Sequence, residues 1–256
     1  MSNFRIFNEI KKFYPTILTF DDMPTTGEDA LQLLIDGNAR FVNETPLIVN
    51  ESRIRVQATQ NVQNPFATIL SCCDSREPVS SLFKRGVGDI FNIRKAGNNM
   101  SGLGIYGSLP NNSTVDNCVI GSVEFSLLGL TTQPKIIVMM CHTNCGAVNA
   151  SYEWYQQNGT NDPVASSSDQ LGYIITGIKS ASRQALDENP VGSYNRAAQY
   201  NVDNNLNFLR DNSTTINSYM NEQDRLVYGA IYNTETGIVE FAKYDVVLRK
   251  CDWVLK

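Results

Sequence analysis

Short apolar runs are the clearest pattern along this chain. Phe66 to Ser71, Asp89 to Ile93 and Lys135 to Met140 each combine consecutive apolar residues with little alternation. Runs of this length are typical of strands buried on both faces of a sheet. Between the second and third runs, Ser122 to Leu130 places its apolar residues at helical spacing. The resulting strand–helix–strand order predicts a parallel sheet.

The first sixty residues are predicted to form a helical arm. Thr26 to Val42 opens with Thr26 three residues before Asp29, which is a weakened form of the capping box. Ala30, Leu34 and other apolar residues then follow at helical spacing. This segment is therefore expected to be an amphipathic helix.

The second half of the chain predicts more helices and then a hairpin. We expect a helix from Cys145 to about Tyr155, and helices that cover the sheet within the polar, Asn-rich segment 156–221, at Leu171 to Ala185 and Ala197 to Leu209. Near the end, the runs Arg225 to Tyr232 and Ile238 to Tyr244 flank a turn at Asn233 to Gly237, which predicts a β-hairpin.

These elements predict an α/β fold with a mostly parallel central sheet flanked by helices, an N-terminal helical arm and a C-terminal β-hairpin. No internal repeat or linker divides the 256 residues. We therefore expect one domain over 1–256, with the arm at 1–60 and the α/β core at 61–256.

Composition and charge exclude several classes of function. With 42% hydrophobic and 18% charged residues, the chain has the composition of a globular protein. The net charge of -5, without a cluster of Lys and Arg, argues against a nucleic-acid partner. No segment approaches the roughly 18 apolar residues of a membrane span, and the first residues lack a signal peptide, so we expect a cytoplasmic protein that does not bind membranes.

Two of the predicted strands end in residues that bind metals. The first is followed by Cys72, and the third by His142 and Cys145, which are three residues apart. Ligand sites in parallel α/β sheets form at the carboxyl ends of strands, so the two loops are expected to meet. We expect His142 and Cys145 to share one face of a first helical turn. Together with Cys72 they make a Cys2His set, which is the ligand set of a catalytic zinc.

Asp74 and Arg76 fit a catalytic role beside such an ion. Asp74 can accept a hydrogen bond from a zinc-bound water, and Arg76 can hold Asp74 ionised and in place. Zinc lowers the pKa of its bound water to about 7, which generates hydroxide at neutral pH.

The other cysteines are expected to have structural roles. Six cysteines are too few and too unevenly spaced for a disulfide scaffold in a chain of this size. Cys118 and Cys251 are expected to be inert buried thiols, and Cys73 and Cys141 to point away from the metal. His142 differs from these residues because it is the only histidine of the chain.

These motifs resemble those of β-class carbonic anhydrases. The chain has C-x-D-S-R from Cys72, G-D-x-F-x-x-R-x-A-G-N from Gly88, S-x-E-[YF] from Ser122 and H-x-x-C-G from His142, in the order found in that family. The resemblance covers roughly Ala30 to Val148 strongly and the C-terminal hairpin more weakly. Several ordered motifs are a more specific signal than one.

The resemblance implies reversible hydration of carbon dioxide to bicarbonate and a proton at a zinc site, in a homodimer or an oligomer of dimers. It implies substrate-binding roles for four further residues. Gln63 matches a glutamine that hydrogen-bonds substrate, and Phe91 and Phe125 match the aromatic walls of the carbon dioxide pocket. Gln63 and the pocket wall would come from the neighbouring subunit. Gly146 closes the second ligand motif. The N-terminal arm would wrap the partner subunit.

Two positions depart from the family pattern. Cys141 replaces the glycine that usually precedes the ligand histidine. Ile69 stands where the subclass with an aspartate-closed zinc commonly has tryptophan. This difference favours the open subclass, in which Asp74 pairs with Arg76 and water takes the fourth zinc site.

Other functions stay open at this point. Relatives of this fold hydrolyse carbonyl sulfide or carbon disulfide with the same three ligands. In a non-catalytic zinc protein the metal would only join two loops, and the presence of both Asp74 and Arg76 argues against this. A thiol redox role for Cys141 or Cys145 is weakened by the absence of Cys-x-x-Cys spacing.

Overall fold

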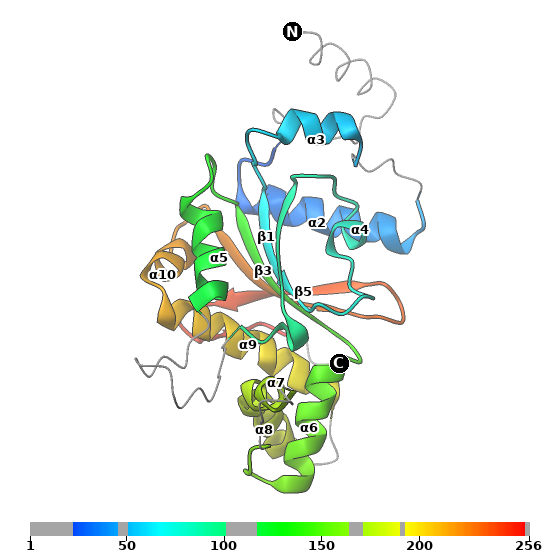
Figure 1. Cartoon of the computed structure of the whole chain (residues 1–256), viewed down its shortest axis with the longest axis vertical. Coiled ribbons are helices and arrows are strands. Elements are labelled where there is room, and N and C mark those ends of the chain that lie inside the picture. The colour runs from blue at the N-terminus through cyan, green and yellow to red at the C-terminus, as the bar shows by residue number, and fades with distance from the viewer. Residues whose placement is uncertain (1–22, 46–50, 101–116, 164–170, 190–192, 254–256) are drawn as a thin grey trace.

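The structure is a computed structural model of the chain (Figure 1), and it describes residues 23–45, 51–100, 117–163, 171–189 and 193–253. Of the predicted N-terminal arm, residues 1–22 and 46–50 therefore lie outside the described residues. Within the described ranges, no helix has the length and apolar character needed to cross a membrane.

In the described part of the chain, six strands form one sheet in the order β2-β1-β3-β4-β5-β6. Neighbouring strands among the first four are parallel, whereas β5 and β6 are antiparallel to the strands before them. Every residue of β1 and β3 is buried, which explains why their sequences are continuous apolar runs. The predicted mostly parallel α/β sheet is confirmed. The strands are β1 Ala67–Ser71, β2 Ile90–Arg94, β3 Ile136–His142, β4 Leu226–Tyr232, β5 Val239–Asp245 and β6 Lys250–Cys251.

The order of the strands places a switch point between β1 and β3. From β1 the chain first adds β2 on one side, and it then crosses back to add β3 on the other side. The register pairs Leu70 with Met139, so the carboxyl ends of β1 and β3 lie side by side. Loops that leave such a point diverge and leave room for a site between them.

One face of the sheet is covered by α2 (Gly27–Val42) and α4 (Val79–Leu82). The N-cap of α2 is Thr26, whose Oγ1 accepts a hydrogen bond from the backbone N–H of Asp29 at 3.1 Å, as the capping pattern predicts. The short helix α3 (Arg53–Thr59) precedes β1. The buried Arg55 of α3 donates from Nη2 to Asp89 Oδ1 at 2.9 Å and so ties this helix to the segment before β2.

The opposite face packs against α5, α9 and α10, with α9 lying along β3 and β4. The prediction that both helical stretches of segment 156–221 cover the sheet is wrong in part. The first stretch divides at Ile178 into α7 and α8, which pack chiefly on α6 and α9 and form an outer layer. These helices are α5 Asn117–Leu128, α6 Gly146–Asn158, α7 Leu171–Gly177, α8 Lys179–Glu188, α9 Tyr194–Asn212 and α10 Thr214–Met220.

The predicted hairpin is formed by β4 and β5. Asn233 Oδ1 accepts hydrogen bonds from the N–H groups of Glu235 and Thr236, and Gly237 has a φ of 78°. The Asn233 side chain and the Gly237 backbone together close the turn, because an asparagine oxygen can bond nearby N–H groups and glycine adopts a positive φ without steric conflict from a Cβ. The hairpin turn lies at the same edge of the sheet as the carboxyl end of β3, where the candidate ligands are.

Candidate metal centre

The ends of β1 and β3 bring Cys72, His142 and Cys145 together. Their ligand atoms all lie within 4.8 Å of one another. All three residues are buried, with exposed fractions of 4%, 1% and 2%. The structure thus assembles the cluster that the two sequence motifs predict, from positions 70 residues apart in the chain.

The local geometry of His142 and Cys145 differs from the prediction. His142 is the last residue of β3, and Cys145 is the N-cap of α6 with an extended backbone (φ -68°, ψ 115°). The two residues therefore do not share a helical turn. A tight connection through Thr143 and Asn144, the latter at φ 55°, folds Cys145 back toward His142. The expected convergence is present, but a strand end and a turn produce it.

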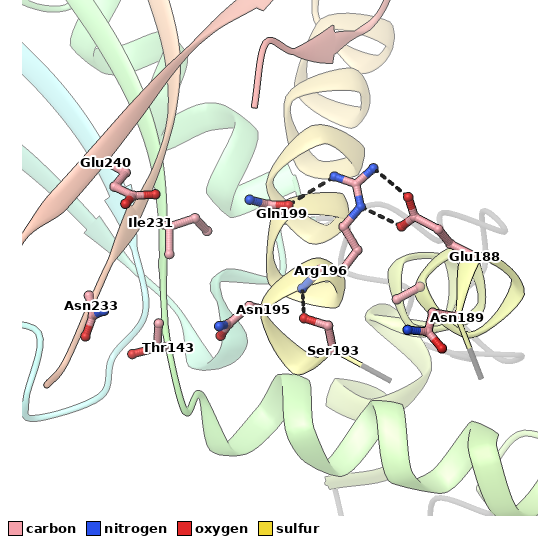
Figure 2. Close-up of a pocket in the computed structure, with 11 residues that line it drawn as sticks. Thr143, Glu188, Asn189, Ser193, Asn195, Arg196, Gln199, Ile231, Asn233 and Glu240 are labelled. Atoms are coloured by element: carbon pink, nitrogen blue, oxygen red, sulfur yellow. Dashed lines mark hydrogen bonds and ion pairs between the residues drawn. The ribbon is translucent and has the colours of Figure 1, made fainter. Parts of the chain in front are cut away.

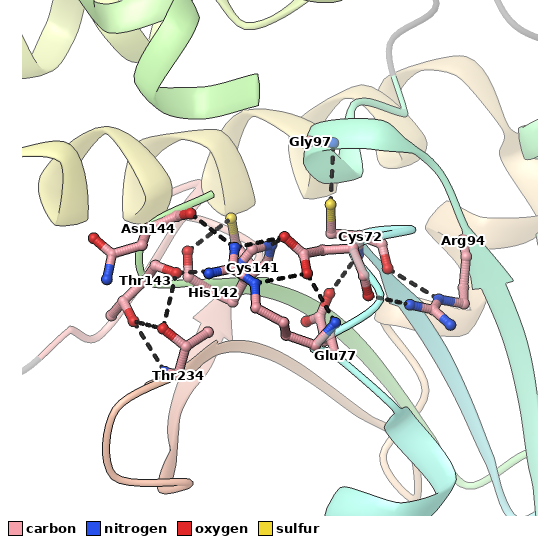
Figure 3. A network of polar contacts seen from close by, with 11 residues as sticks. Cys72, Glu77, Arg94, Gly97, Cys141, His142, Thr143, Asn144 and Thr234 are labelled. Carbon is pink, nitrogen blue, oxygen red and sulfur yellow. Dashed lines mark hydrogen bonds and ion pairs between the residues drawn. The ribbon is translucent and has the colours of Figure 1, made fainter. Parts of the chain in front are cut away.

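Hydrogen bonding orients His142 for metal binding. Nδ1 lies 2.9 Å from the carbonyl oxygen of Thr143, so Nδ1 carries the proton and donates it to that oxygen. Nε2 is buried and has no hydrogen-bond partner. Thr143 is fixed in turn by Thr234 of the hairpin turn, with the two Oγ1 atoms 3.0 Å apart (Figure 3). An unpartnered imidazole nitrogen between two sulfurs fits a zinc ion.

The loop that carries Cys72 is held from several sides (Figure 3). Its Sγ accepts a hydrogen bond from the N–H of Gly97 at 3.3 Å. Its own N–H donates to Glu77 Oε2 at 2.8 Å, and its carbonyl oxygen accepts from Arg94 Nε at 2.9 Å. Arg94 Nη2 also donates to the carbonyl oxygen of Asp74 at 2.7 Å. This backbone is therefore positioned before any ligand binds.

The electrostatics of the cluster favour positive charge between the two sulfurs. Burial lowers the pKa of His142, but the nearby sulfurs of Cys145 and Cys72, which favour a protonated ring, outweigh it and raise this pKa to about 11. The hydrogen bond with Cys145 and burial raise the pKa of the Cys72 thiol to about 12. A bound dication would take the place of these protons, because metal ligands must be deprotonated. Burial also raises the pKa of Glu77 to about 8.

Asp74 and Arg76 form an ion pair at the mouth of the cluster. Arg76 donates from Nε to Asp74 Oδ1 at 3.0 Å and from Nη2 to Oδ2 at 2.7 Å, and its backbone N–H donates to Oδ1 at 2.8 Å. These contacts hold the pKa of Asp74 well below its usual range. Arg76 Nη2 also donates to the carbonyl oxygen of Asn144 at 3.1 Å and so bridges the two loops. Asp74 Oδ2 lies 3.7 Å from His142 Nε2, within reach of a group bound there.

The four residues predicted to bind substrate fall in different places. Phe91 of β2 and Phe125 of α5 are brought together, with ring centroids 6.2 Å apart, and Phe125 is half exposed. Gly146 is the exposed first residue of α6, directly after Cys145. Gln63 is exposed and precedes the amino end of β1, whereas Cys72 follows its carboxyl end. One chain therefore does not bring Gln63 to the cluster.

The remaining cysteines agree with expectation in part. None of the six cysteines forms a disulfide. Cys251 is buried as expected, and Cys141 is buried as well. Cys118 is exposed, and the prediction of a buried thiol there was wrong. It lies at the first turn of α5, where apolar spacing alone did not separate the inner face of the helix from the outer one.

Three further residues of the site, Glu77, Arg94 and Gly97, were not predicted from the sequence. All three contact Cys72 or its loop, and Glu77 is fully buried. Arg94 and Gly97 lie within the G-D-x-F-x-x-R-x-A-G-N block, which was the available signal. Their partners become visible only when β1 and β2 pair.

A polar cavity of about 590 Å³ lies beside the cluster, and Thr143 forms part of its wall (Figure 2). Arg196 of α9 lines it but is already paired, since its Nε donates to Glu188 Oε2 at 2.6 Å and its Nη1 to Gln199 Oε1 at 3.0 Å. The lining also includes Glu240. Because the cavity's carboxylates outnumber its arginine, it is not suited to anions.

Comparison with known proteins identifies the family. A family model described as carbonic anhydrase matches residues 67–239, well over half of the chain. The carbonic anhydrase of Mycolicibacterium smegmatis is 35% identical over 122 residues, which are 48% of this chain and 51% of that protein. The chain thus spans about half the length of the curated relatives that it matches.

Solved structures show the same fold. The β-carbonic anhydrase CcaA has a TM-score of 0.57 at 22% identity, with 87% of this chain and 98% of that chain covered. A structure of two tetrameric β-carbonic anhydrases from Sordaria macrospora has a TM-score of 0.54 at 19% identity, with 83% and 96% covered. With the matched family model spanning both ligand motifs, the chain belongs to the β-class carbonic anhydrase family.

Proposed function

We propose that this protein is a zinc-dependent carbonic anhydrase, which catalyses the reversible hydration of carbon dioxide to bicarbonate and a proton. The observation that carries the proposal is the buried Cys2His cluster with an ionised carboxylate at its mouth. A metal that only joined two loops would not need this carboxylate, nor the arginine that fixes it. The family membership supports the same reaction.

Cys72, His142 and Cys145 would hold the zinc. Two thiolates and one imidazole suit this ion and leave a fourth position free for water or substrate. When bound, zinc lowers the pKa of a coordinated water to about 7 and thereby supplies a nucleophile at neutral pH. Glu77 and Arg94 would keep the Cys72 loop in place through its backbone N–H and carbonyl groups.

Asp74 would orient the reacting water by accepting a hydrogen bond from it. Arg76 supports this role in two ways, because it keeps the carboxylate ionised and contacts both of its oxygens. A two-pronged contact also fixes the direction of the carboxylate, since the guanidinium is planar. The pairing supports an open resting site, in which Asp74 is not itself a ligand.

Phe91 and Phe125 would form the apolar wall for carbon dioxide, which lacks hydrogen-bond donors. Gln63 would reach the substrate only from a second copy of the chain, because it lies at the opposite edge of its own sheet. We therefore propose a homodimer or an oligomer of dimers. The tetrameric relatives from Sordaria macrospora support this assembly. A cytoplasmic location stays a prediction.

Stopped-flow hydration of carbon dioxide by protein of measured zinc content tests the function. Asp74→Asn should keep its zinc and lose hydration activity about 10- to 100-fold, because the amide cannot replace the ionised oxygen. Asp211→Asn is the matched control, since Asp211 forms a surface ion pair with Arg249 away from the cluster. Zinc-loaded protein that hydrates carbon dioxide no faster than buffer would refute the proposal, and parallel assays with carbonyl sulfide and carbon disulfide would reveal a related hydrolase.

A further inference from the structure

A buried polar network connects α9 to the candidate zinc ligand Cys72. It starts at Asn201 and Asn205, which lie one turn apart in α9 and are each only 2% exposed. Asn201 Nδ2 donates to the carbonyl oxygen of Gly97 at 2.8 Å. Gly97 belongs to the 3₁₀ turn η2 (Ala96–Asn98), which follows β2. This bond joins positions 104 residues apart in the sequence.

Asn205 fixes the orientation of Asn201. Asn205 Nδ2 donates to the carbonyl oxygen of Asn201 at 2.7 Å and to its Oδ1 at 3.0 Å, while Asn205 Oδ1 accepts from the N–H of Met100 at 2.7 Å. A buried amide left without a hydrogen-bond partner destabilises the folded protein, because the cost of removing that amide from water is no longer offset. Because both ends of Asn205 are in use, Asn201 is left with one favourable orientation, in which Nδ2 points at Gly97.

Gly97 is confined from the other sides as well. Its φ is 63°, and a Cβ at this position would lie 2.7 Å from Ile178 Cδ1 and 2.8 Å from Ala147 Cβ. Its N–H points at Cys72 Sγ, 3.3 Å away (Figure 3). The same residue thus accepts a hydrogen bond from α9 and donates one to the sulfur. The position of Gly97 therefore decides whether the Cys72 sulfur accepts this hydrogen bond.

We propose that Asn201 is a positioning residue for the Cys72 thiolate, acting through Gly97. This inference rests on the proposed zinc site. A hydrogen bond to a thiolate is charge-assisted and withdraws electron density from the sulfur, so it lowers the charge that the sulfur donates to the metal. Asn201 keeps this bond in place by holding the carbonyl end of Gly97. The inner face of helix α9, far from the ligands in sequence, thereby adjusts the metal centre.

Cobalt substitution provides a readout that does not depend on activity. Asn201→Leu removes the donor to Gly97, and Asn201→Asp keeps the size of the side chain and the acceptor for Asn205 but places an oxygen against the Gly97 carbonyl. In both variants the ultraviolet thiolate-to-cobalt charge-transfer band should move to longer wavelength, because the sulfur has lost a hydrogen bond. Zinc affinity at neutral pH, measured by competition with a chromophoric chelator, should fall about 10-fold, equivalent to about 1.4 kcal/mol. The fall is expected because zinc binds the deprotonated sulfur, which the N–H of Gly97 stabilises against reprotonation.

Asn207→Leu is the matched control. Asn207 lies in the same helix, but its side chain bonds Tyr244 and Arg249 near the C-terminus. This variant should keep the wild-type band and zinc affinity. Should Asn201→Leu fail to fold by circular dichroism, Asn205→Asp takes its place, because it retains the acceptor for Met100 and loses only the donors that orient Asn201.

The outcomes separate this inference from the proposed function. Wild-type protein that binds neither cobalt nor zinc would refute the metal site itself. The positioning role would be overturned if wild-type protein binds cobalt but the Asn201→Asp or Asn205→Asp variant has the wild-type charge-transfer band and zinc affinity. Loss of thermal stability without a shift of the band would also overturn it, since that is the result of a purely structural amide.

Discussion

Replacing Gly97 by alanine tests how tightly the metal centre is packed against the helices. The added Cβ would lie 2.7 Å from Ile178 Cδ1 and 2.8 Å from Ala147 Cβ, closer than side-chain carbons approach one another. The backbone φ of 63° would also have to persist in a residue that carries a Cβ. Gly97→Ala therefore combines a steric conflict with an unfavourable backbone conformation.

The two effects give an expected loss of stability. A left-handed backbone costs a residue with a Cβ about 1–2 kcal/mol. An extra methyl group in a well-packed site costs about 1–3 kcal/mol. Neither neighbour can move freely, because Ala147 is in α6 and Ile178 is buried at the junction of α7 and α8. The free energy of unfolding should therefore fall by about 2–5 kcal/mol.

Urea denaturation of the metal-free protein, followed by circular dichroism, measures this change. Gly146→Ala is the matched control, since its Cβ would meet nothing within 4 Å and the residue lies in the first turn of a helix. This control should stay within about 1 kcal/mol of wild type. An unfolding free energy of Gly97→Ala within the same margin would refute the packing argument. Folded Gly97→Ala protein should also bind zinc more weakly, because the N–H that faces Cys72 is displaced.

Three further predictions concern the metal and the reaction. Elemental analysis should find about one zinc per chain. The zinc should be lost in Cys72→Ala or His142→Ala and kept in the control Cys73→Ala, and full zinc in Cys72→Ala would contradict the ligand assignment. Arg76→Ala should keep zinc but lose most hydration activity in stopped flow, and Arg76→Lys should be poor too, because an ammonium cannot make the two-pronged contact with Asp74; wild-type rates would favour a structural metal. Finally, His142 is the only histidine and is committed to the cluster, so proton export needs another carrier. Added imidazole buffer should raise saturating turnover near pH 7 with little change in kcat/KM, whereas turnover independent of buffer concentration would indicate an internal relay.

Much of the fold was predictable because its signals are local. A strand buried on both faces must be apolar throughout, and the runs around Ile69 and Val138 therefore identified β1 and β3. Likewise, the capping residue Thr26 and the turn chemistry at Asn233 depend on neighbours a few residues away. The candidate ligands were also predictable, because few residue types bind zinc and these stand at strand ends.

The sequence by itself identified the candidate ligands and the pair Asp74 and Arg76, and the tertiary structure decided how they are held. His142 meets Cys145 through a strand end and a turn. This turn depends on the left-handed backbone of Asn144, which the spacing of residues in the sequence does not encode. The bond from Gly97 to Cys72 forms because β1 and β2 pair, and the bond from Asn201 to Gly97 forms because α9 packs across the sheet. These contacts join residues 25 and 104 positions apart, so no periodicity within a window of sequence contains them. Only the packed chain brings their donors and acceptors within hydrogen-bond distance.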